Sequence, residues 1–91
     1  MTTDTLDITI YFRDEDDRLI RLIRELDELD VAYDECRIAD APSEVVEQLA
    51  RAGGGEPASP SVSINGEILP APTTANIMSA IMHAKSGGFY Q

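Results

Sequence analysis

The chain has 91 residues, 43% of them hydrophobic and 26% charged, which is enough for one buried core and too little for several domains. Seventeen acidic residues stand against seven basic ones, giving a formal net charge of −10. Such a chain repels phosphate, and it contains neither a basic patch nor a long apolar run, so we expect no nucleic-acid or membrane partner. The single cysteine, Cys36, excludes an intramolecular disulfide and a cysteine-only metal site.

The acidic residues are spread along the chain rather than gathered in a tail, which is typical of a solvated surface. Salt screens the repulsion within such a surface, so we interpret it as an adaptation to a salt-rich cytoplasm. The alternative is an acidic surface that docks a basic partner protein. Residues 1–7 have neither the basic start nor the apolar stretch of a signal peptide, which also predicts a cytoplasmic location.

The first half of the chain predicts a strand, a helix, a strand and a helix. Residues 8–12 alternate in polarity, with Ile8, Ile10 and Phe12 on one face. Apolar residues then recur at three- and four-residue steps, which indicates an amphipathic helix over Leu19, Leu22, Ile23, Leu26 and Leu29. Charged pairs one turn apart are expected to add a little stability to it: Asp14/Arg18, Asp17/Arg21 and Arg24/Glu28.

Residues 31–38 predict a second strand in which Cys36 and Ile38 share a face, and we expect Cys36 to be an inert core residue. Asp40 or Ser43 can open a second helix that ends at Gly53, and residues 53–60 form a loop. Residues 61–64 and 67–69 predict a hairpin around Asn65-Gly66, because this dipeptide accepts positive φ angles.

Thr73 or Thr74 can cap a last helix before Gly87-Gly88. The predicted order is βαβαββα in a single domain over residues 1–91, with flexible tails at 1–6 and 87–91. A strand-helix-strand unit favours a parallel crossover, and the hairpin must join the same sheet to hide its apolar face. We therefore predict an α/β fold with one sheet flanked by helices.

Three segments in this order resemble a glutaredoxin, a member of the thioredoxin-fold family. They are Ile8-Thr9-Ile10-Tyr11, Val31-Ala32-Tyr33, and Pro60-Ser61-Val62-Ser63-Ile64-Asn65-Gly66-Glu67, and together they span most of the chain. The resemblance implies a four-stranded mixed sheet whose first two strands are parallel, and a cis peptide bond before Pro60.

The chain departs from the family where the chemistry lies. The family carries one or two cysteines at the start of the first helix, whereas this sequence has Asp16 and Leu19 there. Among the four acidic residues 14–17 we expect a carboxylate to cap the helix rather than to bind a metal. The family's glutathione-binding Gly-Gly and acidic residues are matched by Pro70-Ala71-Pro72-Thr73-Thr74, which lacks two amide donors, so glutathione binding is disfavoured.

No other residue predicts a catalytic centre. Cys36 has three acidic neighbours, Asp34, Glu35 and Asp40, which disfavour a thiolate. His83 has no cysteine or second histidine beside it, and no base accompanies Ser59, Ser61 or Ser63. We expect no metal and no cofactor.

The sequence therefore predicts a redox-inactive glutaredoxin-like module that binds a partner protein through its altered active-site region. We expect the binding residues to be Arg13, Asp14, Asp16, Ser59, Pro60, Thr73 and Thr74. One alternative is a divergent thiol oxidoreductase that uses Cys36 or a partner's cysteine. Another is a structural or oligomer-forming subunit, with the edge of the second strand and the Phe89-Tyr90 tail as contacts.

Overall fold

The computed structural model describes residues 6–87, and their side chains as far as residue 84. Residues 6–87 form seven main elements in the predicted order, and a short 3-10 helix, η1 (Ile38–Asp40), precedes the second α-helix. The elements are β1 (Ile8–Phe12), α1 (Asp17–Glu28), β2 (Asp34–Arg37), α2 (Ser43–Ala52), β3 (Ser61–Ile64), β4 (Glu67–Pro70) and α3 (Thr74–Gly87).

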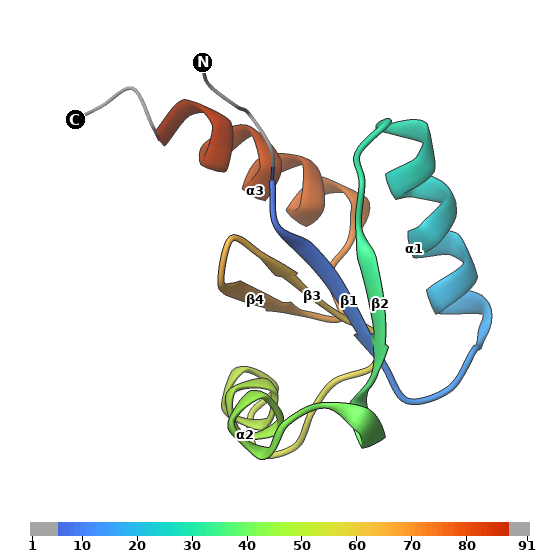
Figure 1. Cartoon of the computed structure of the whole chain (residues 1–91). Helices are drawn as coiled ribbons and strands as arrows, with labels where there is room; N and C mark the ends of the chain where they lie inside the picture. Colours follow the sequence, from blue (N-terminus) through green and yellow to red (C-terminus); the bar gives the residue numbers. More distant parts are fainter. Residues whose placement is uncertain (1–5, 88–91) are drawn as a thin grey trace.

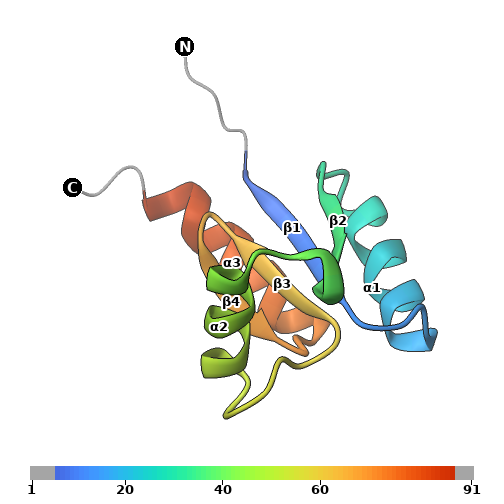
Figure 2. The same cartoon turned by 60° about the horizontal axis from the view of Figure 1, so that its bottom comes forward.

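The four strands form one mixed sheet in the order β2-β1-β3-β4. β1 and β2 are parallel, whereas β3 pairs antiparallel with both β1 and β4. Helices α1 and α3 lie on one face of the sheet and α2 lies on the other (Figures 1 and 2). The predicted α/β architecture, a four-stranded mixed sheet with its first two strands parallel and with flanking helices, is confirmed.

The main core fills the space between the sheet and the helices α1 and α3. Successive side chains of a strand point to opposite faces of the sheet, so apolar residues at every second position of β1 and β3 face these helices. Apolar residues at helical spacing on the helices pack against them. The buried members are Ile8, Ile10, Phe12, Leu19, Leu22, Leu26, Val62, Ile64, Ile77 and Ile81. The predicted buried faces of β1 and α1 are confirmed.

Helix α2 contacts β4, and its Leu49 is fully buried. We expected Asp40, or Ser43 after Pro42, to open this helix. The helix begins at Ser43, with Pro42 as an N-cap that makes no side-chain hydrogen bond, whereas Asp40 belongs to η1. The predicted end at Gly53 is confirmed, and a Cβ there would collide with the main-chain oxygen of Glu56, so the sharp exit from α2 requires glycine.

The hairpin and the start of α3 follow local sequence rules. Asn65 and Gly66 have φ angles of 51° and 92°, as the Asn-Gly turn predicts. Thr73 and Asn76 cap α3 reciprocally: the Asn76 N–H donates to Thr73 Oγ1 over 3.1 Å, and the Thr73 N–H donates to Asn76 Oδ1 over 3.0 Å. The prediction of a threonine cap is confirmed for Thr73.

Strand β2 is shorter than the predicted range of 31–38. Its pairing with β1 covers only Asp34–Arg37, because the chain enters from a left-handed residue, Asp30, and turns into η1 at Ile38. β2 is also an edge strand, so its side chains have a neighbouring strand on one side only. Cys36 is therefore half-buried and not part of the core, contrary to our expectation.

The predicted tails lie mainly outside the described residues. Residues 1–5 and 88–91, including Phe89 and Tyr90, fall in this category. Leu6 is half-buried against the core, and α3 continues to Gly87. Within residues 6–87, no helix has the length and apolar character needed to cross a membrane.

Candidate functional site

The loop between β1 and α1 carries the residue that starts the first helix. Asp16 has extended backbone angles, and its Oδ1 accepts a hydrogen bond from the Leu19 N–H over 3.1 Å. This arrangement satisfies one of the unpaired amide donors at the helix N-terminus. The predicted carboxylate cap is confirmed and belongs to Asp16.

Replacing Asp16 with alanine is expected to lower the free energy of unfolding by about 1 kcal/mol, because the cap is lost. Asp16→Asn should restore most of the loss, since its side-chain oxygen can accept the same hydrogen bond. Urea unfolding curves provide the measurement. Asp14→Ala is the control, because Asp14 uses only its main-chain oxygen, which accepts from the Asp16 N–H. An equal loss in both alanine variants would contradict the capping role.

Arg13 fastens this loop to the segment that precedes β3. Its N–H donates to Ser59 Oγ over 2.9 Å, and its Nη2 donates to the Pro57 carbonyl, also over 2.9 Å. The fully buried Ser61 donates to the Ala58 carbonyl over 2.7 Å. Two chain segments more than forty residues apart are thus held side by side.

The segment after β4 joins the same region through its main chain. The Ala71 N–H donates to the Pro60 carbonyl over 3.0 Å, and Ala71 has a φ angle of 42°. The peptide bond between Ser59 and Pro60 is cis, as the resemblance implies. Pro60, Ala71 and the cap of α3 therefore adjoin one another beside α1.

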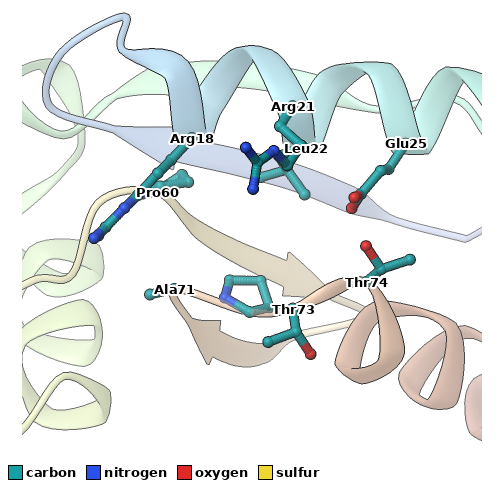
Figure 3. A pocket seen from close by; sticks show the side chains of 9 residues that line it. Arg18, Arg21, Leu22, Glu25, Pro60, Ala71, Thr73 and Thr74 are labelled. Carbon is teal, nitrogen blue, oxygen red and sulfur yellow. The ribbon is translucent and has the colours of Figure 1, made fainter.

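Two open hollows adjoin the Ser59–Pro60 segment, one lined by Pro60 and the other by Ser59. The larger, of about 460 Å³, is a groove between α1 and the segment after β4, lined by Arg18, Arg21, Leu22, Glu25, Pro60, Ala71, Pro72, Thr73 and Thr74 (Figure 3). The smaller, of about 400 Å³, is lined by Arg13, Asp14, Asp16, Arg18, Gly53, Glu56, Pro57, Ala58, Ser59 and Ala71. Arg18 and Ala71 line both.

The structure gathers all seven predicted binding residues around these hollows. Arg13, Asp14, Asp16 and Ser59 line the smaller hollow, whereas Pro60, Thr73 and Thr74 line the groove. Sequence reasoning missed Arg18, Arg21 and Glu25: it assigned the two arginines to ion pairs along the helix and gave Glu25 no role. Their spacing of three and four residues puts them on one helical stripe with Leu22, and this spacing was the available signal.

The predicted ion pairs along α1 do not form. Among the side chains of residues 6–84, the one pair within 4.0 Å joins Arg37 Nη2 to Glu15 Oε2 at 3.4 Å. Asp14 precedes the N-cap and so is not one helical turn from Arg18. For the other two pairs, an exposed pair contributes so little that ordering two long side chains offsets it.

Cys36 lies on the face of the sheet opposite the start of α1. It is paired with Tyr11, whereas its neighbour Arg37 is paired with Phe12 and sits 5.2 Å from the centre of that ring, on the α1 side. Alternation along β2 therefore directs Cys36 toward the α2 side. Its thiol donates to the Arg37 carbonyl over 3.4 Å.

The phenol of Tyr11 shares this face with Cys36. Burial raises the pKa of Tyr11 above its ordinary value of 10.0, the charges of Cys36 and Asp7 raise it further, and a hydrogen bond with Thr9 lowers it. A raised pKa means that the folded protein holds this proton more tightly than the unfolded chain does. The resulting stabilisation is complete below pH 10 and is lost as the pH rises through the folded-state pKa.

We therefore expect the free energy of unfolding to fall more steeply above about pH 10 in the parent protein than in Tyr11→Phe. Urea unfolding between about pH 8 and about pH 11 measures this difference. Tyr33→Phe serves for comparison, since burial and the hydrogen bond to Asp27 also raise the pKa of Tyr33. Parallel curves for the parent and Tyr11→Phe would contradict the prediction.

Other candidate residues lie apart from the two hollows. His83 is exposed on α3 and lines a separate hollow with Glu67 and Ser79. Within the described residues, no three histidine, cysteine, aspartate or glutamate side chains come together in a way that could hold a metal ion. A comparison of the chain with models of known families finds no match, and neither does a comparison with curated proteins.

Proposed function

We propose that the chain is a redox-inactive glutaredoxin-like module of the thioredoxin fold, which binds an extended segment of a partner protein beside Pro60. The order of elements and the strand order β2-β1-β3-β4 support this assignment. The proposed setting is a salt-rich cytoplasm, on the strength of the net charge of −10.

The observation that carries the proposal is the carboxylate at the start of α1. Asp16 occupies the position of the family's thiol and caps the helix with its Oδ1. A carboxylate cannot exchange electrons with a disulfide, and Cys36 is directed to the other face of the sheet. The region around the site nevertheless offers two open hollows, one lined by Pro60 and the other by Ser59.

The main chain before β3 suits the binding of an extended peptide. The β3 ladder begins at Ser61, so the backbone at Ser59 lies outside it. A strand-like peptide can pair with such a backbone and place alternate side chains in the neighbouring hollows. Arg13 lines the smaller hollow and Thr73 lines the groove. The Arg13 N–H also holds Ser59 in place by donating a hydrogen bond to the Ser59 Oγ.

Titration of isotope-labelled protein with a pool of random extended peptides tests the proposal by nuclear magnetic resonance. We expect the first chemical-shift changes at Arg13, Ser59, Ala71 and Thr73. Changes confined to α2 and the α2 face of the sheet would contradict the placement.

A matched pair of variants locates the binding site further. Thr74→Trp should fill the groove and weaken peptide binding about tenfold, the equivalent of about 1.4 kcal/mol. Ala75→Trp is the control, because Ala75 is exposed on the next position of α3 and does not line the groove. Neither change removes the Thr73–Asn76 cap. Equal affinity of both variants for the pool would place binding elsewhere.

The lack of thiol chemistry is tested separately. A disulfide-reduction assay should give negligible and equal rates for the parent protein and for Cys36→Ser, because no thiol stands at the start of α1. A clear rate that disappears in Cys36→Ser would instead support a divergent thiol oxidoreductase.

A further inference from the structure

One wall of the groove carries all of its charge. Arg18, Arg21 and Glu25 follow one stripe of α1, and their side chains extend toward the opposite wall in Figure 3. That opposite wall consists of Pro60, Ala71, Pro72, Thr73 and Thr74, which supply apolar surface and hydroxyl groups but no charge. Charge recognition in this groove therefore depends on α1 alone.

These three charged groups are not neutralised within the fold. Across the side chains of residues 6–84, neither Arg18 nor Arg21 has a carboxylate within 4.0 Å, and Glu25 has no cation within that distance. This is notable for the arginines, because the chain has seventeen acidic residues. A ligand can thus meet two cations and one anion that have no ion-pair partner among these side chains.

The spacing of the charges matches an extended peptide. Measured along the helix axis, the main-chain positions of Arg18 and Arg21 are separated by about 4.5 Å and those of Arg21 and Glu25 by about 6 Å. Side chains on one face of an extended chain recur every two residues, at about 6.6 Å. One carboxylate can therefore reach both arginines while the side chain two residues along faces Glu25.

We propose that the groove selects a peptide segment with an internal aspartate or glutamate opposite Arg18 and Arg21 and with a lysine or arginine two residues away, opposite Glu25. This inference rests on the proposed function and names the class of its partner. A nucleic acid would place a further phosphate against Glu25 and would meet a protein of charge −10, so a segment carrying both signs fits better.

Selection from a displayed library of random peptides between fixed flanks tests the pattern, and the flanks keep free termini away from the groove. The parent protein should enrich peptides in which a basic residue lies two residues before or two residues after an acidic one. In the charge swap Arg21→Glu/Glu25→Arg, the residue that faces position 25 should change from basic to acidic. The control swap Arg24→Glu/Glu28→Arg has the same spacing and net charge but lies outside the groove, so it should keep the parent preference.

Affinity measurements give the size of the effect. A labelled threonine-valine peptide with a central Glu-Val-Lys should bind about fivefold more tightly than its Gln-Val-Gln counterpart, as expected for exposed ion pairs. Circular dichroism checks that both swaps fold, and Glu25→Gln replaces the groove swap if that variant does not. The single change should abolish the preference for a basic residue.

The outcomes separate the two proposals. Equal binding of the charged and neutral peptides, with shifts at Ser59 and Thr73, would overturn the charge pattern and leave peptide binding standing. Binding of neither peptide, together with no enrichment from the library, would overturn both. A parent preference shared by both swaps would show that the groove charges do not select the ligand.

Discussion

Potassium chloride is expected to raise the melting temperature of this protein by roughly 5 to 10 °C between about 0.05 M and about 2 M. The reason is the balance of charge: seventeen acidic residues face seven basic ones. Among the side chains of residues 6–84, one ion pair lies within 4.0 Å, so the fold itself neutralises little of this charge. At 1 M salt the Debye length is about 3 Å, which screens most of the repulsion between separate carboxylates.

A variant with fewer carboxylates provides the control for this salt effect. Asp14→Asn, Asp40→Asn and Glu47→Gln change exposed side chains that lie outside the helix caps and the Arg37–Glu15 pair. The triple variant should melt at a higher temperature than the parent in low salt and should gain less from added salt. A parent protein that melts at the same temperature in low and high salt would refute the salt interpretation and favour the alternative, an acidic surface made to dock a basic partner.

The elements that the sequence predicts best are those fixed by local chemistry. Asn65-Gly66 turns the hairpin because its two residues tolerate positive φ angles, whatever the sheet does around them. The caps at Asp16 and Thr73 likewise depend on a side-chain oxygen and an amide three residues along. Such features are visible in a single sequence.

The end points of β2 depend on its partner strand. The sequence predicts one strand over residues 31–38, yet only four of them pair with β1, because the chain leaves the sheet at Ile38. The half-exposure of Cys36 has the same origin, since no pattern in the sequence indicates that β2 is the edge strand. Strand order is a tertiary property, and it decides which side chains are covered.

The candidate site was predictable in its loops but not in its helix. The resemblance to the glutaredoxins indicated Arg13, Ser59, Pro60 and Thr73, all of which line the two hollows. Helical periodicity separates the buried side of α1 from the remainder, but it does not reveal which polar stripe faces another segment. Arg21 lines the groove because the segment after β4 lies opposite it, and this tertiary arrangement cannot be read from the periodicity of α1.

Replacing Leu26 with alanine is expected to have the largest effect on stability of any single change considered. Leu26 has no exposed surface and lies in the core between α1 and the sheet. Its truncation removes buried apolar contacts and leaves a cavity, which typically lowers the free energy of unfolding by about 2 to 5 kcal/mol. A domain of this size has roughly 5 to 15 kcal/mol in total, so this single change removes a large share of its stability.

Ile20→Ala is the matched control on the same helix. Its side chain is 51% exposed, and its truncation should change the free energy of unfolding by no more than about 0.5 kcal/mol. Urea unfolding of both variants is best compared in high salt, where the carboxylate repulsion is screened and the parent protein is most stable. Similar losses for the two would mean that α1 does not present its Leu19, Leu22 and Leu26 stripe to the sheet. The adjoining stripe of α1 forms one wall of the groove, so the placement of the groove would then also be wrong.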